Sequence, residues 1–494
     1  VTLAACGPLP FALVGLGGLG LGSLLWYVAI EHSATLRGLG DPVLGAALVL
    51  GVALGFAGWI AYGTYVARRG GIPPVTSLRA DAWSWAALVL VALGMWGPSP
   101  ALGPARAAFL AFAVWALVKL GVAARHVLTV RAVLTTFVVT RIPIIVIAEL
   151  ASIVVAPRPG VHAAISQYPL LAVWGRWDAV HFLDIAQHGY YGTEMAFFPL
   201  YPLAIRTLGA LLGNDLLAGL LISNVAFFFG LLFFYKLVEH QFDRTVARRA
   251  TFYVSIFPTA VFFSAVYSES LFFALTVASF YYISEHRWLR AGVLGALASA
   301  TRPEGVLLVV PLLIEAAATA GGWRALVASP RRATRQLMGT ALVPLGLLLY
   351  MAWLWVLRGD PLYFSHVQVH WGRHFAPPWV SLIDAVGKIA HGPPVGIANE
   401  GIQLAFTLLM VALLIGSFGR LRPSLVAYML LSILVPLSTS SLMSMPRFAL
   451  VLFPMFMVLA LWGKRPSFNN AIVAFSLPLL GLFTVLFANW YWVA

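Results

Sequence analysis

The main shortage in this sequence is charge: Asp, Glu, Lys and Arg make up only 10% of its 494 residues, whereas soluble domains carry about 25%. Cysteine is nearly absent as well, and the single Cys6 excludes a disulfide within the chain. Hydrophobic residues account for 61%, in recurring runs of roughly 20 residues that are long enough to cross a bilayer as helices. The composition excludes a soluble domain and a disulfide-stabilised scaffold, and it predicts a polytopic helical membrane protein.

Acidic residues are the scarcer charged class, with 17 against 31 basic residues and a net charge of +14. A basic chain can indicate nucleic-acid binding. Here, however, the Lys and Arg clusters fall in alternate loops between apolar runs, as expected when basic loops are held on the cytoplasmic side. We therefore expect no nucleic-acid partner. The same alternation places two long loops, 157–213 and 358–400, on the outer side of the membrane.

The apolar runs predict an all-α polytopic membrane fold with about 13–15 transmembrane helices. Pro and Gly interrupt the region 250–320, so its helices are expected to be short. The expected helices are residues 9–30, 43–66, 82–97, 105–124, 132–156, 214–238, 250–266, 268–284, 290–301, 305–320, 337–357, 401–418, 424–440, 447–463 and 470–490.

The chain is predicted to divide near residue 128. Residues 1–128 contain about four of the helices, and their acidic residues, Glu31, Asp41 and Asp81, lie at expected helix ends. An accessory transmembrane bundle is the simplest interpretation of this part. Residues 129–494 contain both long outer loops and every unusual polar cluster, so we expect the catalytic transmembrane domain there.

The first outer loop concentrates polar and aromatic residues in WGRWDAVHFLDIAQHGYYG, residues 174–192. Within this stretch, residues 178–187 predict a helix that breaks at Gly189. Its apolar side suits a position in the membrane interface, and its other side is polar. The sequence therefore predicts an amphipathic helix that presents polar side chains next to the outer face of the membrane.

The polar side of this helix carries Asp178 and His181, which are three residues apart and share a face. Asp184 follows about one turn later. Solvation of an exposed helix face explains this polarity equally well, but it does not explain why Trp177 directly precedes Asp178 beside a lone arginine. We therefore expect a functional role for Asp178 first and for Asp184 second.

A second polar cluster, Tyr267, Ser268 and Glu269, separates two apolar runs. If the runs are one helix, Glu269 is an intramembrane carboxylate, and such groups are rarely without function. If the runs are two helices, the cluster is their outer turn. A helix cap provided by Ser268 or Ser270 is the structural alternative.

Two arginines follow at outer helix ends: Arg302 in ATRPEG (300–305) and Arg447 in MPRF (445–448). Arg302 is expected at the outer membrane face, although basic residues are more common on the cytoplasmic side. Glu304 falls in the first turn of the next helix, where a carboxylate suits the helix dipole. Arg302 therefore either pairs with a carboxylate, that of Glu269 or Glu304, or binds a phosphate.

The second outer loop contains FSHVQVHWGRHFAPPW, residues 364–379. Its histidines at 366, 370 and 374 have a spacing that could line one helix face, which raises a zinc site as an alternative. No His-Glu-x-x-His pattern is present, and Gly372 weakens a helix, so we expect no metal. Four residues remain as candidates for the outer cavity: Gln368, His370, Trp371 and Arg373.

Together these clusters predict an outer cavity with carboxylates, cations and aromatic side chains. Cations suit a phosphate, aromatic rings suit sugar faces and lipid, and a carboxylate suits deprotonation of a hydroxyl group. These are the needs of sugar transfer from a lipid phosphate. A transporter would instead place ionisable groups near the midplane, where only Arg141 and Glu149 stand out; Glu149 and Glu315 receive no role.

From about residue 130 onward the chain resembles the PIG-V (GPI mannosyltransferase II) family and its bacterial relatives. The resemblance covers roughly three quarters of the chain, and its motifs occur in the family's order. They are WDAVHFLDIAQHGY (177–190), AFFPLYP (196–202), SAVYSESLF (264–272), ATRPEG (300–305), VQVHWGR (367–373) and MPRF (445–448).

The resemblance implies a GT-C glycosyltransferase fold, a polyprenyl-phosphate-linked donor such as polyprenyl-phosphate-mannose, and inverting transfer at the outer or lumenal face. It assigns the catalytic carboxylate to Asp178. We expect the donor phosphate and sugar to be bound by His181, Glu269, Arg302, Arg373 and Arg447. The other cavity candidates are Trp177, Asp184, Tyr267, Ser268, Glu304, Gln368, His370 and Trp371.

This scheme demands no metal or other cofactor, and it leaves divalent-metal dependence open. The Gly-, Ala- and Arg-rich composition is typical of a bacterium with high GC content, where GPI anchors are not expected, so we expect a plasma-membrane protein with another lipid or glycan as acceptor. The alternation of basic loops predicts that its site faces outward. Two alternatives remain: a GT-C transferase acting on protein or polysaccharide, and a flippase or transporter for lipid-linked sugars.

Overall fold

The computed structural model describes residues 117, 120–159, 169–328 and 330–493. The chain divides into two compact units, residues 1–134 and 135–494, and nearly all described residues belong to the second unit. The four helices expected before residue 128 lie outside the described residues almost entirely. The assignment of residues 1–128 to an accessory bundle therefore stays a prediction.

The described residues form helices joined by short turns, with no strand among them and one isolated bridge between Phe375 and Thr439. The longer helices are α5 (Leu128–Val154), α7 (Asp178–His188), α8 (Leu200–Leu212), α9 (Asp215–Gln241), α10 (Arg244–Ser255), α11 (Glu269–Ser284), α12 (Trp288–Thr301), α13 (Val309–Ala320), α15 (Thr334–Leu342), α16 (Leu345–Arg358), α18 (Pro378–His391), α19 (Pro394–Ser417), α20 (Pro423–Leu437), α22 (Pro454–Trp462) and α23 (Pro466–Ala488). The shorter elements are α6 (Pro169–Ala172), η2 (Gly192–Ala196), η3 (Ala260–Phe263), η4 (Pro303–Leu308), α14 (Trp323–Ala328), η5 (Pro330–Ala333), α17 (Tyr363–His366), η6 (Val367–Trp371) and α21 (Met445–Val451).

Five of these segments are long and apolar enough to cross a membrane, or up to seven if each of two bent helix pairs is counted as one span. Every helix expected after residue 128 has a counterpart in the structure. The predicted all-α polytopic membrane fold is therefore confirmed. Several of the expected spans are shorter than predicted or are bent. The count of five to seven spans covers only the described residues, so it does not include the helices expected before residue 128.

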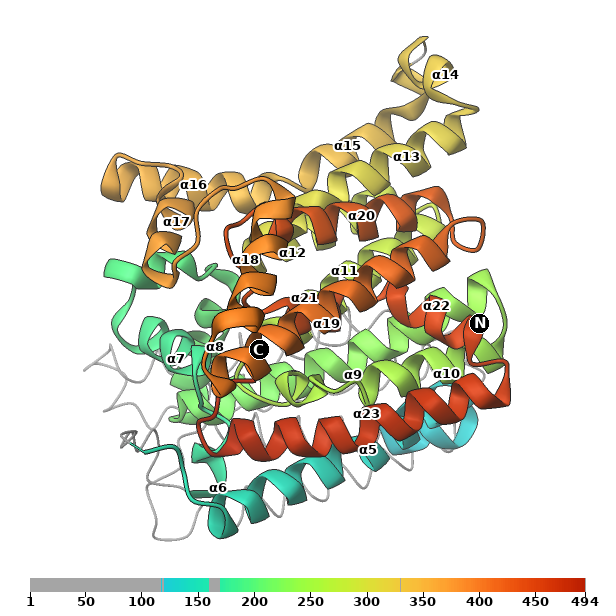
Figure 1. Cartoon of the computed structure of the whole chain (residues 1–494). Helices are drawn as coiled ribbons and strands as arrows, with labels where there is room; N and C mark the ends of the chain where they lie inside the picture. Colours follow the sequence, from blue (N-terminus) through green and yellow to red (C-terminus); the bar gives the residue numbers. More distant parts are fainter. Residues whose placement is uncertain (1–116, 118–119, 160–168, 329, 494) are drawn as a thin grey trace, which may run out of the picture. The chain divides into compact units, whose positions relative to one another are not determined.

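Helices α9, α11 and α12 form the centre of the second unit, and α9, α11, α19, α20 and α23 run roughly parallel (Figure 1). Aromatic rings fill the space between α9 and its neighbours: the rings of Phe227 and Phe263 stack with centroids 4.3 Å apart. Helix α11 runs away from Glu269, and α12 returns to Thr301, next to Arg302. This hairpin therefore brings Glu269 and Arg302 to the same end of the bundle.

The helix expected at 250–266 is wrong beyond residue 255. Helix α10 ends at Ser255, and the chain turns before η3. Pro258 is the physical reason, because it lacks an N–H and disfavours helix in the residue before it. The break leaves backbone carbonyl groups without helical donors. Arg141 supplies them: its guanidinium donates to the carbonyl oxygen of Ser255 and, at 2.8 Å, to that of Ala260.

Arg141 therefore serves as an internal clamp on the broken segment, and we expect Arg141→Met to destabilise the protein by about 3 kcal/mol or more. Two buried carbonyl groups would lose their donor, and each such loss costs about 1–3 kcal/mol. Arg141 is only 2% exposed, so water cannot readily replace it. Thermal melting in detergent measures the effect, with Arg131→Met on the exposed side of the same helix as the control; equal melting of both variants would contradict the clamp.

The span expected at 447–463 is also broken. It consists of α21 and α22, which are bent by 78°. Pro454 opens α22, and Leu452 and Phe453 form the corner. The bend places Arg447, on the short α21, inside the bundle rather than on a membrane-facing surface.

Candidate active site

Asp178 begins helix α7, which confirms the helix predicted at 178–187. The residue before it, Trp177, has a φ of 57°, a strained backbone conformation for a bulky side chain. The Tyr267 hydroxyl stabilises this turn from the next polar cluster: it accepts from the Asp178 N–H at 3.2 Å and donates to the Arg176 carbonyl oxygen at 3.1 Å. The backbone at Asp178 is therefore held by Tyr267, a residue that is distant in sequence.

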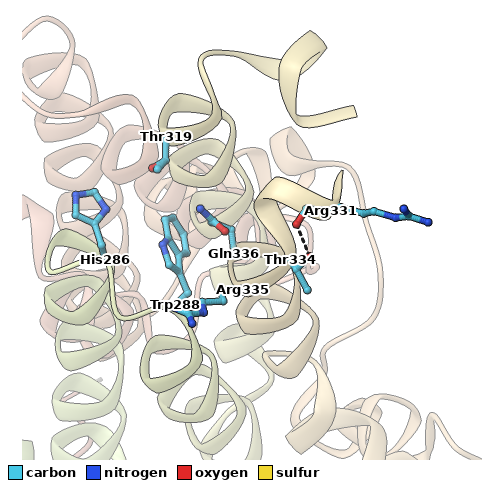
Figure 2. A pocket seen from close by; sticks show the side chains of 7 residues that line it. All are labelled: His286, Trp288, Thr319, Arg331, Thr334, Arg335 and Gln336. Atoms are coloured by element: carbon cyan, nitrogen blue, oxygen red, sulfur yellow. Dashed lines mark hydrogen bonds between the residues drawn. The ribbon is translucent and has the colours of Figure 1, made fainter. Parts of the chain in front are cut away.

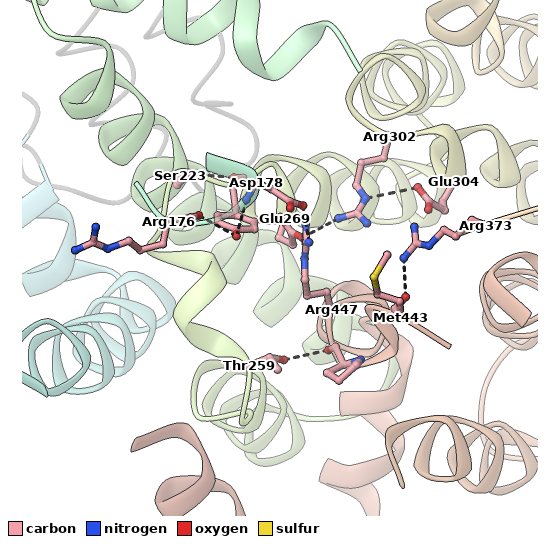
Figure 3. A network of polar contacts seen from close by, with 12 residues as sticks. Arg176, Asp178, Ser223, Thr259, Glu269, Arg302, Glu304, Arg373, Met443 and Arg447 are labelled. Atoms are coloured by element: carbon pink, nitrogen blue, oxygen red, sulfur yellow. Dashed lines mark hydrogen bonds and ion pairs between the residues drawn. The ribbon is translucent and has the colours of Figure 1, made fainter. Parts of the chain in front are cut away.

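Arg447 joins two carboxylates in the interior (Figure 3). Its Nη1 lies 2.6 Å from Oδ2 of Asp178, and its Nη2 lies 2.7 Å from Oε1 of Glu269. The guanidinium also packs over the Tyr267 ring, 4.8 Å from the centroid. Glu269 is fully buried, whereas the Asp178 side chain is 24% exposed. One arginine thus connects an accessible carboxylate to an inaccessible one.

Arg302 is the second cation on Glu269. Its Nη1 lies 3.0 Å from Oε1 of Glu269, and its Nε lies 3.5 Å from Oε2 of Glu304. The structural alternative raised from the sequence, pairing of Arg302 with Glu269 or Glu304, is therefore present with both partners. We call Asp178, Glu269, Arg302, Glu304, Arg373 and Arg447 the acid–arginine cluster.

Asp178 is the member of this cluster best placed to accept a proton. Its Oδ2 is held by Arg447, but its Oδ1 has no hydrogen-bond partner among the described residues. Burial alone would raise the pKa of Asp178; the charge and hydrogen bond of Arg447, together with His181 and Arg373, outweigh burial and hold that pKa below its ordinary value. Asp178 is therefore ionised at neutral pH, with one free oxygen on an accessible side chain.

Arg373 differs from the other two arginines because no described carboxylate lies within ion-pair distance of it. Its Nη2 donates to the Met443 carbonyl oxygen at 2.6 Å, and its Nε is buried without a hydrogen-bond partner. Burial, with the nearby charge of Arg447, lowers the pKa of Arg373 to about 10, so it stays charged at neutral pH. Arg373 is thus a cation near Asp178 that makes no ion pair with any residue the structure describes.

His181 lies next to the cluster and pairs with a carboxylate that the sequence analysis missed. Its Nδ1 lies 2.9 Å from Oε1 of Glu194, which is buried in η2. The ring stacks on Phe197 and meets the edge of Trp371. Burial would lower the pKa of His181, but the Glu194 hydrogen bond and charge raise it above the ordinary value. Glu194 could have been noticed, because the chain has only 17 acidic residues.

The structure does not bring all predicted residues together. Asp184 lies on an exposed face, where it contacts His188 at 2.8 Å and the Tyr191 hydroxyl. This is the solvated face weighed as the alternative. Ser268 is buried beside Glu269 but provides no side-chain cap for α11, so the capping alternative is wrong for Ser268.

The histidines of the second long loop do not line one helix face. The αL conformation of Gly372, with a φ of 66°, ends η6. His370 is exposed, with Nδ1 3.2 Å from the Val367 carbonyl oxygen; His366 contacts Asp360, and His374 contacts Ser440. No group of three metal-binding side chains occurs among the residues that the structure describes.

The fold and the cluster define a polytopic membrane protein with an enzyme-like polar site at one end of its helices. Within that class, residues 115–354 match the family described as Mannosyltransferase (PIG-V). The predicted resemblance is therefore confirmed over this segment. The match includes Asp178, Glu269 and Arg302, and it ends before Arg373 and Arg447.

Individual relatives show the same similarity. GPI alpha-1,6-mannosyltransferase 2 of Cricetulus griseus is 37% identical over 161 residues, which are 29% of this chain and 32% of that protein. GPI mannosyltransferase 2 of Cryptococcus neoformans is 32% identical over 151 residues, which are 28% of this chain and 36% of that protein. The matched segment thus spans about a third of these relatives.

Among solved structures, the oligosaccharyltransferase of Archaeoglobus fulgidus matches 70% of this chain and 53% of its own chain. The sequence identity is 13%, and the TM-score is 0.32. A score at this level does not establish a common fold.

Proposed function

We propose that this protein is an inverting membrane mannosyltransferase that uses a polyprenyl-phosphate-linked mannose and transfers the sugar to a lipid or glycan acceptor at the outer membrane face. The observation that carries the proposal is the ionised, accessible carboxylate of Asp178, which lies in the segment that matches the PIG-V family and is held by Arg447 from outside that segment. The alternation of basic loops supports the outer face.

Asp178 is proposed as the general base. Its free Oδ1 takes the proton of the acceptor hydroxyl, whose oxygen forms a bond to C1 of the sugar. The bond from C1 to the phosphate oxygen breaks, and the electron pair leaves with the polyprenyl phosphate anion. A single displacement of this kind inverts the anomeric configuration. The leaving phosphate already exists as an anion, so charge stabilisation matters more than proton donation.

Arg373 is our first candidate for the leaving phosphate. Arg302 and Arg447 already contact carboxylates, whereas Arg373 has no such partner among the described residues and a buried, unpartnered Nε. His181 is the next candidate: its Nδ1 is held by Glu194, and its Nε2 has no described partner. Arg302 and Arg447 then neutralise Glu269, Arg302 also contacts Glu304, and Arg447 positions Asp178.

The direct test combines purified protein with polyprenyl-phosphate-mannose and candidate membrane lipid acceptors. Mass spectrometry detects the product, and NMR of the anomeric proton reports its configuration. We expect lipid-linked mannose to be consumed with inversion. Use of a nucleotide sugar in place of the lipid-linked donor, or retention of configuration, would overturn the proposal. Movement of the intact lipid-linked sugar without a new glycosidic bond would favour a flippase.

Arg373→Gln is expected to raise the KM for the donor about tenfold or more, with a smaller effect on the acceptor KM. The substitution keeps a polar side chain but removes the charged donor, and charge-assisted hydrogen bonds are about twice as strong as neutral ones. Steady-state kinetics measures the difference. Arg358→Gln, at an exposed arginine at the end of α16, is the matched control, and an unchanged donor KM in Arg373→Gln would remove Arg373 from the phosphate site.

A further inference from the structure

A polar cavity of about 470 Å³ lies where α12, α13 and α15 meet (Figure 2). The described residues of its wall are mostly polar or basic, and none of them is acidic. The lining residues are His286, Trp288, Thr319, Arg331, Thr334, Arg335 and Gln336.

This cavity is separate from the acid–arginine cluster. Helix α11 starts at Glu269 in the cluster and runs 16 residues away from it, and α12 starts at Trp288 and takes 14 residues to return. At about 1.5 Å per residue, each helix spans roughly 20 Å. The cavity therefore lies at the opposite end of this hairpin, on the side where basic loops predict the cytoplasm.

The cavity presents hydrogen-bond donors that have no partner. Trp288 is only 5% exposed, and its indole N–H makes no hydrogen bond with any described residue. Its ring lies next to Arg335 and Gln336, while the Arg331 side chain extends outward (Figure 2). Neither arginine lies within ion-pair distance of a described carboxylate. The cavity thus carries the positive charge of Arg335, with Arg331 beside its rim, and an indole N–H that has no partner among the described residues.

Backbone packing fixes this arrangement. Trp288 opens α12, and Thr334, Arg335 and Gln336 form the first turn of α15, so the positive ends of two helix dipoles lie at the cavity. The two helices touch at Gly292 and Gly339, where a Cβ on either glycine would collide with the backbone of the other helix. The backbones of the two helices that carry Trp288 and Arg335 are therefore held in place before any ligand binds.

We propose that this cavity binds a phosphate ester that also carries a hydroxyl group, as a glycerol phosphate headgroup does. The Arg335 guanidinium and the indole N–H of Trp288 suit the phosphate oxygens. The hydroxyl groups of Thr319 and Thr334 donate to backbone carbonyl oxygens, so their oxygens remain as acceptors for a ligand hydroxyl. Such a ligand is either the headgroup of an anionic lipid or a water-soluble phosphate.

The test is calorimetric titration of the purified full-length protein in a neutral detergent. The probes are short-chain phosphatidylglycerol, short-chain phosphatidylcholine and glycerol 3-phosphate. We expect phosphatidylglycerol to bind more tightly than phosphatidylcholine. Arg335→Gln should weaken its binding about tenfold, which corresponds to the loss of one charge-assisted contact. Trp288→Phe, which removes the indole N–H together with part of the ring system, should weaken binding in the same direction.

Arg324→Gln, at an exposed arginine of α14 outside the cavity lining, is the matched control and should bind normally. If glycerol 3-phosphate binds with the same sensitivity to the two cavity variants, the site is confirmed and its ligand is water-soluble. Equal weakening in all three variants, or no weakening in either cavity variant, would overturn the proposal. Melting temperatures show which variants are folded, and the two different cavity substitutions keep the test valid if one is not.

Discussion

Asp178→Asn is expected to lower sugar transfer by about 10²–10⁴-fold, the usual effect of losing a general base. Asparagine keeps the size of the side chain and can still accept a hydrogen bond from Arg447, but it cannot take a proton at neutral pH. The measurement is single-turnover transfer from lipid-linked mannose by protein that elutes as a folded species.

Because the pKa of Asp178 lies below its ordinary value, the wild-type rate should not decline through protonation of Asp178 until the pH falls below about 4.

Asp184→Asn is the matched control for this prediction. It changes a second carboxylate on the same helix, but one that contacts His188 and Tyr191 on an exposed face. We expect it to retain most of the activity. Full activity of Asp178→Asn would exclude Asp178 as the base, and a larger loss in Asp184→Asn would move the catalytic assignment to Asp184.

Arg447→Met is expected to destabilise the protein by about 3–5 kcal/mol, because removing one partner leaves a buried charge uncompensated. Glu269 is fully buried and would retain only Arg302, while Asp178 would lose its ion-pair partner. Methionine fills a similar volume and cannot replace either contact. Thermal melting in detergent, together with the yield of folded protein, measures the loss.

The double variant Glu269→Gln with Arg447→Met separates charge from packing. It removes the buried carboxylate together with its partner, so it should be more stable than Arg447→Met alone. A double variant less stable than the single one would show that Arg302 alone compensates the charge of Glu269, so that the loss in Arg447→Met is not caused by an uncompensated glutamate. Near wild-type stability of Arg447→Met would contradict the central role of this ion pair.

Hydropathy predicted the helices well because long apolar runs have few alternatives to membrane helix. It failed where proline breaks a run, at Pro258 and Pro454, because an average over many residues does not detect one missing N–H. The sequence also could not show how such breaks are stabilised. Arg141 occurs 114 residues before the carbonyl group of Ser255 to which it donates.

The site was predictable as a set of residue types but not as a set of contacts. Asp178, Glu269, Arg302 and Arg447 were identified because ionisable residues are rare in this chain and costly in an apolar setting. The sequence pattern could not decide which arginines contact carboxylates. The structure shows these contacts for Arg302 and Arg447, whereas Arg373 contacts no described carboxylate. Glu194 was missed because it follows the aromatic motif without any helical spacing to His181, and the backbone turn at Gly189 and Gly192 brings them together.

The two cations on Glu269 also have a consequence during synthesis. Arg302 is 33 residues after Glu269, whereas Arg447 is 178 residues after it. At about 5–20 residues per second, Arg302 emerges from the ribosome roughly 2–7 s after Glu269, and Arg447 only after about 9–36 s. The nascent chain thus acquires a local partner for this glutamate as soon as the α11–α12 hairpin forms, and the later arrival of Arg447 adds the connection to Asp178.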